Sequence, residues 1–167
     1  MAWDTAKAHM HPHHHDVVIG PPYDFGDLDI VAKSGLLTGS GVLFKQCAHY
    51  GGKLYNPSVI MVHFTTSIGT ARQVIADMDS QHVSSHVVVD RSGELWQAVP
   101  FNRVAMHAGA GGWSGYRNNI NEHAIGIEVN NLGPLWLSEN NRFIDSYGID
   151  RDFRGFEHRD RRVDIIP

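Results

Sequence analysis

The chain has 167 residues, 42% of them hydrophobic, so it can bury one core of ordinary size, and global disorder is not expected. Its formal net charge of -4, with histidine neutral, argues against a protein that mainly binds nucleic acid, because phosphate contacts need clustered Lys and Arg. The single cysteine, Cys47, excludes an internal disulfide, and the sequence has no apolar run of the roughly 18 residues that would predict a membrane span.

The first fifteen residues, "MAWDTAKAHMHPHHH", are rich in histidine, and we expect a disordered tail over residues 1–15. The cluster His11–His15 could bind metal, but a flexible terminus or an expression remnant is the favoured interpretation. The stretch lacks the apolar centre of a secretory signal, and the cellular location stays open. Residues 16–57 are rich in Gly, Pro and Asp, so we expect loops with little regular structure there.

The folded domain is expected over residues 58–167, and its first element is a strand, Ser58–Phe64. This segment is nearly all apolar, which is typical of a central strand buried on both faces. The next segment, Gly69–Ser80, has apolar residues at helical spacing and predicts a short amphipathic helix that packs on the sheet.

Further strands are predicted along the rest of the domain. Ser85–Pro100 predicts two strands around the turn "DRSG", and Ala124–Val129 predicts another apolar strand. Between them, Arg103–Gly109 indicates a short strand or turn, and Gly111–Asn121 a polar loop. After Gly133 the pattern weakens, with two short strands possible at the C-terminal end. The sequence therefore predicts an α/β fold: a single domain with a central mixed β-sheet of about four to six strands, flanked by helices.

The stretch "VIMVHFTTS" places His63 at the end of the first predicted strand. A histidine in such a place is more often a packed core residue with a satisfied hydrogen bond. The alternative is a functional imidazole, because sheet proteins carry their sites at strand ends. Thr65, Thr66 and Ser67 could then orient the ring through hydrogen bonds.

The stretch "AIGIEVNN" places a carboxylate, Glu128, inside an apolar strand, where burial without a partner is costly. Glu128 shares a strand face with Gly126 and Asn130, so this face is small and polar, as in the wall of a cleft. A general base beside a metal-bound water is a common use of such a group. The alternative is a glutamate on a solvated face.

The remaining polar candidates are weak signals on their own. His107 in "MHAG" is a loop histidine of the kind that is usually solvated, and Asn121 in "NINEHAIGIE" is of the kind that usually serves a turn. His86 follows two serines, and we expect it to pack structurally rather than to bind a metal. Four other histidines have no supporting context: His9, His49, His82 and His123.

Four segments follow the order and spacing of one enzyme family: "VIMVHFTTS", "VSSHVVVDRSGELWQAVP", "VAMHAG" and "NNINEHAIGIEVNN". Together they resemble the zinc-dependent N-acetylmuramoyl-L-alanine amidases of the AmpD-like type, which share their fold with peptidoglycan-recognition proteins and phage lysozyme-like amidases. The resemblance covers roughly Leu43 to Gly133, and "FKQCAHYGGKLYNP" is similar to the segment that precedes the family's first histidine.

The resemblance implies a peptidoglycan hydrolase that uses Zn²⁺ to cleave the amide bond between N-acetylmuramic acid and the L-alanine of the stem peptide. Peptidoglycan or a muropeptide would be the substrate and partner. His63 matches the first zinc ligand, and Glu128 matches the general base that activates the zinc-bound water. His107 and Asn121 match positions that line the substrate groove, and we expect Thr65 there as well.

A catalytic zinc site needs three protein ligands. The family carries the other two after a late helix, in a segment of the kind "GH…PGRK.DPG", which this sequence lacks. Three alternatives follow, and the favoured one is a chain truncated before that helix. In the second, His158 and Asp164 complete the site, although a solvated charge cluster is the favoured interpretation of these two residues.

In the third alternative the domain has lost zinc and is a non-catalytic peptidoglycan-binding module. If a covering helix is absent, the sheet would expose apolar surface, and the chain could then associate with itself.

Overall fold

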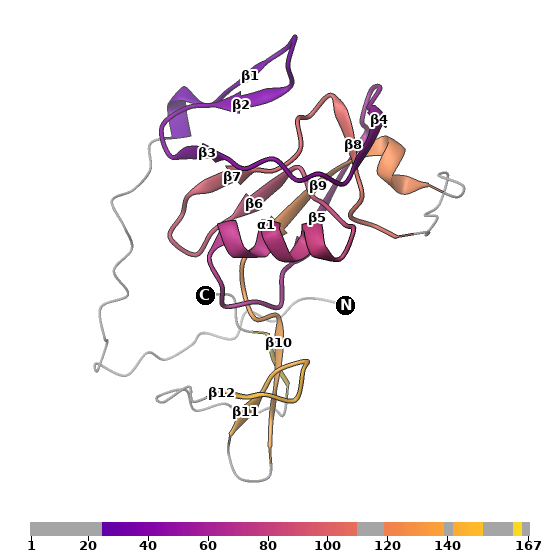
Figure 1. Ribbon diagram of the computed structural model, residues 1–167. Helices are drawn as coiled ribbons and strands as arrows, with labels where there is room; N and C mark the ends of the chain where they lie inside the picture. Colours follow the sequence, from indigo (N-terminus) through magenta and orange to yellow (C-terminus); the bar gives the residue numbers. More distant parts are fainter. Residues whose placement is uncertain (1–24, 110–118, 139–141, 152–161, 165–167) are drawn as a thin grey trace, which may run out of the picture.

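The structure, a computed structural model, describes residues 25–109, 119–138, 142–151 and 162–164. The expected tail of residues 1–15 lies outside the described residues. The described part contains a five-stranded mixed sheet, one α-helix and three smaller sheets (Figure 1). The predicted α/β fold with a central mixed sheet is therefore confirmed.

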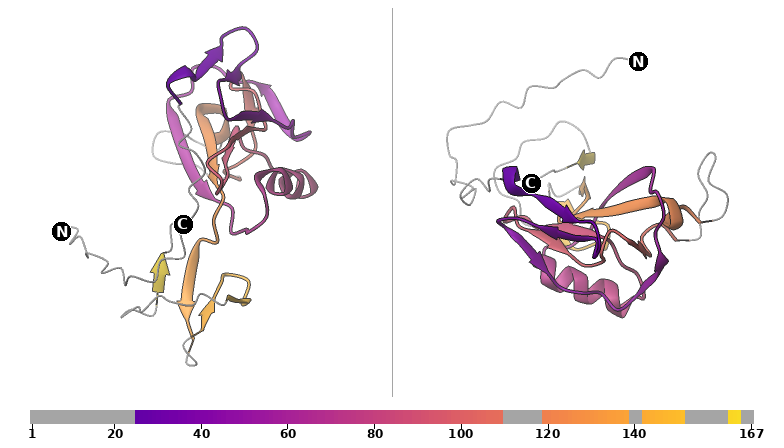
Figure 2. Two further views of the ribbon diagram at one scale, coloured as in Figure 1. Left: turned by 90° about the vertical axis from the view of Figure 1, so that its left-hand side faces the viewer. Right: turned by 90° about the horizontal axis from the view of Figure 1, so that it is seen from above.

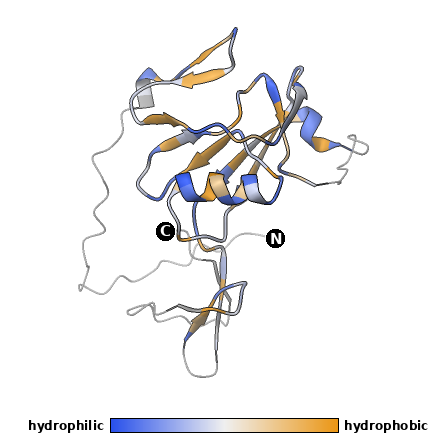
Figure 3. Cartoon of the chain, in the orientation of Figure 1, coloured by the Kyte–Doolittle hydropathy of each residue, from blue (hydrophilic) through white to orange (hydrophobic). Residues whose placement is uncertain are grey.

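The central sheet has the strand order β3-β7-β6-β9-β5. Its strands are β3 (Val42–Phe44), β5 (Val59–Phe64), β6 (Val87–Val89), β7 (Leu95–Gln97) and β9 (Ala124–Val129). The pair β6–β7 is antiparallel, as the turn "DRSG" predicted, and the other three pairs are parallel. Figure 3 shows that these strands are mostly hydrophobic, as strands of a central sheet should be.

Strand β5, which carries His63, lies at the edge of this sheet. On one of its faces Ile60, Val62 and Phe64 are 68%, 65% and 48% exposed. The prediction of a central strand buried on both faces was therefore wrong. An apolar run indicates a strand, but the place of that strand in a sheet depends on partners that lie far away in the sequence.

Helix α1 (Ala71–Ser80) confirms the predicted amphipathic helix. Thr70 caps it, because the Thr70 hydroxyl accepts from the Gln73 N–H while the Gln73 side chain accepts from the Thr70 N–H. Figure 2 shows the helix against one face of the central sheet. The buried core between them contains Cys47, Ala71, Val74, Ile75, Val88, Ala98, Val99 and Ala105.

The N-terminal segment contains short strands where loops were expected. After a 3-10 turn, η1 (Phe25–Asp27), the strands β1 (Asp29–Val31) and β2 (Leu36–Thr38) form a hairpin. Strand β4 (Tyr50–Lys53) pairs with β8 (Arg103–Ala105), and β3 joins the central sheet beside β7. The expectation of little regular structure over residues 16–57 was wrong for the described part, because β1 and β2 pair with each other and β3 and β4 pair with strands far along the chain.

A second, four-stranded sheet follows the central one, with the order β12-β11-β10-β13. Its strands are β10 (Pro134–Leu137), β11 (Phe143–Ile144), β12 (Asp150–Arg151) and β13 (Arg162–Asp164). Figure 1 shows this sheet below the central one, where the chain leaves β9. Strand β13 is one of the two short strands expected at the C-terminal end. In the described ranges, no helix has the length and apolar character needed to cross a membrane.

Candidate active site

His63 on β5 and Glu128 on β9 are directly paired neighbours in the parallel ladder, so their side chains project from the same face of the sheet. Glu128 is also paired with Val88 on β6, and Val88 belongs to the core beneath α1. The imidazole and the carboxylate therefore lie on the helix-covered face, at the C-terminal ends of their strands.

His107 reaches the same place from a different segment. It follows β8 (Arg103–Ala105), and its Nδ1 lies 3.2 Å from Nε2 of His63. Its ring also rests on the backbone of Gly126, where an added Cβ would come within 2.4 Å of Cδ2 of His107. Glycine at this position thus permits the approach, and the fold brings His63, His107 and Glu128 together from three distant segments.

Glu128 is an unusual carboxyl group in two respects. Burial raises its pKa to about 7, and its Oε2 is buried without a hydrogen-bond partner in the described structure. A carboxyl group whose pKa lies near neutrality can both accept and return a proton at neutral pH. The position and the electrostatics of Glu128 therefore suit a general base.

Burial favours the neutral form of both histidines of the site. Burial lowers the pKa of His63. Burial also lowers the pKa of His107, to about 4, with a smaller contribution from repulsion by His63 and His86. Neutral imidazoles have a free ring nitrogen and are the form that binds metal ions.

The described residues of this site supply fewer than the three protein ligands that a catalytic metal site needs. Buried polar atoms almost always have a partner, yet Oε2 of Glu128 and Nε2 of His107 have none in the described structure. Two such atoms beside the neutral imidazole of His63 point to a ligand that completes the site. Within the described ranges, no three His, Cys, Asp or Glu side chains are grouped so as to hold a metal ion.

Asn121 holds the loop that carries His107. It lies in the 3-10 turn η2 (Ile120–His123) and is buried, and its Oδ1 accepts from the backbone N–H groups of His107 at 3.1 Å and Ala108 at 3.0 Å. Thr65, two residues after His63, donates its hydroxyl to Oδ1 of Asn130 at 3.1 Å. Both residues thus border the site, and their contacts with substrate stay predictions.

The two C-terminal candidate ligands are not brought to this site by anything that the structure describes. His158 lies outside the described residues. Asp164 ends β13, where its backbone is paired with that of Pro134 in the second sheet. Their roles as ligands therefore stay predictions.

His86 has the packing role that the sequence predicted. It is fully buried, its Nδ1 accepts from the Gly126 N–H at 2.9 Å, and its Nε2 lies 2.9 Å from the carbonyl oxygen of Arg103. Both ring nitrogens are thus used by the backbone. Because Gly126 also contacts His107, the hydrogen bond from Gly126 to His86 helps to hold the backbone against which His107 packs.

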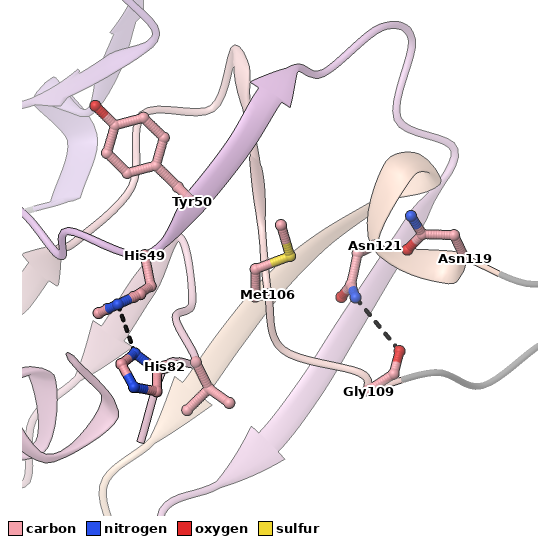
Figure 4. Close-up of a pocket in the computed structure, with 8 residues that line it drawn as sticks. His49, Tyr50, His82, Met106, Gly109, Asn119 and Asn121 are labelled. Atoms are coloured by element: carbon pink, nitrogen blue, oxygen red, sulfur yellow. Dashed lines mark hydrogen bonds between the residues drawn. The ribbon is translucent and has the colours of Figure 1, made fainter. Parts of the chain in front are cut away.

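A pocket of about 590 Å³ lies beside the site and shares Asn121 with it (Figure 4). It is lined by His49, Tyr50, His82, Val83, Met106, Gly109, Asn119 and Asn121. Nothing in the sequence predicted that His49 and His82 would meet, because they are 33 positions apart and only the folded chain joins them. No local motif marks either residue.

The chain matches a family model described as N-acetylmuramoyl-L-alanine amidase over residues 53–159. It is 33% identical over 98 residues to the 1,6-anhydro-N-acetylmuramyl-L-alanine amidase AmpD of Citrobacter freundii, which covers 48% of this chain and 52% of that protein. It is 32% identical over 82 residues to the N-acetylmuramoyl-L-alanine amidase AmiD of Escherichia coli, which covers 45% of this chain and 29% of that protein. The chain thus spans about half or less of the length of these relatives.

Among solved structures, the crystal structure of a selenomethionine AmpD derivative superposes with a TM-score of 0.45 and 27% identity, over 59% of this chain and 64% of that chain. The family model is the more informative finding, because it matches more than half of the chain and includes His63, His107 and Glu128. The chain belongs to the N-acetylmuramoyl-L-alanine amidase family.

Proposed function

We propose that this protein hydrolyses the amide bond between N-acetylmuramic acid and the L-alanine of the stem peptide, in peptidoglycan or in a muropeptide. One observation carries the proposal: inside the segment matched by the family model, a partly buried carboxyl group with a pKa of about 7 lies in register with a neutral histidine.

The cofactor of this proposal is Zn²⁺, with His63 as one ligand. A zinc ion supplies Lewis-acid polarisation of the amide carbonyl and lowers the pKa of a water molecule. Neutral His63 suits this role, and the pairing of β5 with β9 holds its backbone beside that of Glu128. His158 and Asp164 are the candidates in this sequence for further ligands, against the favoured interpretation of a solvated charge cluster, and zinc content distinguishes the two.

Glu128 is the proposed general base. Its unpartnered Oε2 takes a proton from the attacking water, and the same carboxyl group then gives that proton to the leaving amine of L-alanine. His107, held by Asn121, borders the space where the amide would lie, and Thr65 borders it from the end of β5.

The test is the release of stem peptide from a purified muropeptide by the full chain supplied with Zn²⁺, followed by chromatography and mass spectrometry. We expect Glu128→Gln to lower the rate by about 10²- to 10⁴-fold, the usual contribution of a general base, while zinc content and fold are kept. Glu94→Gln is the matched control, because Glu94 lies in the β6–β7 hairpin and not among the residues of the proposed site. Its Oε2 accepts hydrogen bonds from the Trp96 indole N–H and the Ser92 hydroxyl.

Two outcomes would contradict the enzymatic proposal. Equal rates for Glu128→Gln and the wild-type chain would remove the assigned base. Retention of the chain on insoluble peptidoglycan, with no stem peptide released at any zinc concentration, would favour a non-catalytic binding module.

The proposed C-terminal ligands are tested by zinc content. If His158 and Asp164 bind the ion with His63, His158→Gln and Asp164→Asn each lower the tightly held zinc per chain, as His63→Gln does. Unchanged zinc in both variants would exclude them as ligands.

A further inference from the structure

A second group of ionisable side chains lies outside the proposed catalytic site, between the start of β4 and the end of α1. Nε2 of His49 and Nδ1 of His82 face each other at 2.6 Å, at one end of the pocket (Figure 4). The two rings meet edge to face, at an interplanar angle of 75°. Two imidazole nitrogens in this position share a single proton, because two protons between them would clash.

The outer nitrogen of His49 is held by a carboxylate. Oδ1 of Asp79 accepts three hydrogen bonds: from Nδ1 of His49 at 3.0 Å, from the Ala48 N–H at 2.7 Å and from the Cys47 thiol at 2.9 Å. These contacts fix the Nδ1–H tautomer of His49 and direct its Nε2 lone pair toward His82. A carboxylate that holds the far nitrogen of an imidazole is the arrangement that orients histidine ligands at metal sites.

The second ring, that of His82, lies at the surface. His82 is exposed and follows α1, with a backbone φ of +58°, a conformation that residues other than glycine adopt only occasionally. Two nitrogens bound at about 2.0–2.1 Å in a tetrahedral site lie about 3.3 Å apart, so the rings need to separate by less than about 1 Å. The pocket beside them leaves room for water to fill the remaining coordination positions.

We propose that His49 and His82 form a binding site for a divalent first-row transition metal, separate from the catalytic site, with Asp79 orienting His49. The metal takes the place of the proton between Nε2 of His49 and Nδ1 of His82. That proton is not lost from the neutral pair, because His82 carries it on Nε2 instead. Imidazole pairs of this kind favour Cu²⁺, Ni²⁺ and Zn²⁺ over Mg²⁺ or Ca²⁺.

The test is a titration of the full chain with Zn²⁺, followed by nuclear magnetic resonance of the assigned histidine rings. We expect the signals of His49 and His82 to shift together along one binding curve, with the ring proton of His82 moving from Nδ1 to Nε2. Separate signals report on His63 and on the N-terminal histidines, so failure of the catalytic proposal and failure of this one are distinguishable.

Two substitutions test the separate roles of His82 and Asp79 in metal binding. His82→Gln should weaken Zn²⁺ binding at His49 at least about tenfold, and Asp79→Asn should weaken it about 10- to 100-fold, the usual effect of losing an orienting partner. His123→Gln is the control, because His123 is exposed on η2 and lies outside the cluster.

The proposal is overturned if the His49 and His82 signals stay unchanged while other histidines respond to Zn²⁺. It is also overturned if His49 responds equally in His82→Gln. The tautomer change is read in the wild-type chain, so the test stands even if a variant does not fold.

Discussion

Glu128 combines a partly buried carboxyl group with an oxygen that has no partner, and this has a measurable consequence for stability. Its pKa rises from an ordinary 4.5 to about 7 on folding. Between these pH values the folded chain binds a proton that the unfolded chain does not, so the free energy of unfolding falls as pH rises. The loss is on the order of 3 kcal/mol at most, because solvent screens a partly exposed group.

We therefore expect Glu128→Gln, in chelator-treated protein, to be more stable than the wild-type chain above pH 7 and equally stable below pH 4.5. Glutamine stays neutral and avoids the cost of a buried charge. Urea unfolding at several pH values measures the difference. A stability difference that is constant from pH 4 to pH 8 would contradict the assigned pKa.

Substitution of Asn121 tests whether its side chain stabilises the loop that carries His107. Asn121→Ala leaves the N–H groups of His107 and Ala108 without their acceptor and should cost about 1–3 kcal/mol. It should also lower activity, because His107 loses its support. Asn121→Asp keeps an acceptor oxygen and should restore much of both properties. Equal unfolding midpoints for the alanine variant and the wild-type chain would show that the two bonds contribute nothing.

Strand β9 positions the site through one glycine. Gly126 lies between His86, which accepts its N–H, and His107, whose ring would meet an added Cβ at 2.4 Å. We expect Gly126→Ala to displace His107, to destabilise the fold by about 1–3 kcal/mol and to lower activity by about 10²-fold. Activity assays and thermal unfolding of the same preparation measure both effects.

Gly52→Ala is the control for this prediction. Gly52 lies in β4, and an added Cβ there would meet nothing within 4 Å. If the two alanine variants behave alike, the close contact between Gly126 and His107 is not what limits the site.

At the scale of the whole molecule, the notable feature is the apolar face of the edge strand. Ile60, Val62 and Phe64 project away from the face that α1 covers and are largely exposed. Large exposed apolar surfaces and open, flat edge strands both promote association. We expect this chain to associate with itself as its concentration rises.

Light scattering after gel filtration measures this directly. Val62→Lys should reduce the association, because it places a charge on the edge strand, whereas Ile30→Lys on the β1–β2 hairpin should leave it unchanged. A wild-type chain that remains monomeric at all concentrations would contradict the prediction.

The sequence by itself determined the elements whose signals are local. The apolar runs at 59–64 and 124–129, the apolar spacing of α1 and the turn "DRSG" are read within a few residues each, and all four recur in the structure. The same stretches marked His63 and Glu128, because an ionisable residue in an apolar strand is visible without knowledge of the fold.

Only the tertiary structure decided the order of the strands and the contacts between distant segments. In the structure β5 lies at an edge of the central sheet, and β3, from a segment expected to be loop, pairs with β7. His107 contacts His63 across 44 positions, and His49 contacts His82 across 33 positions. Pairing between remote strands depends on the packing of the whole core, which no local pattern encodes.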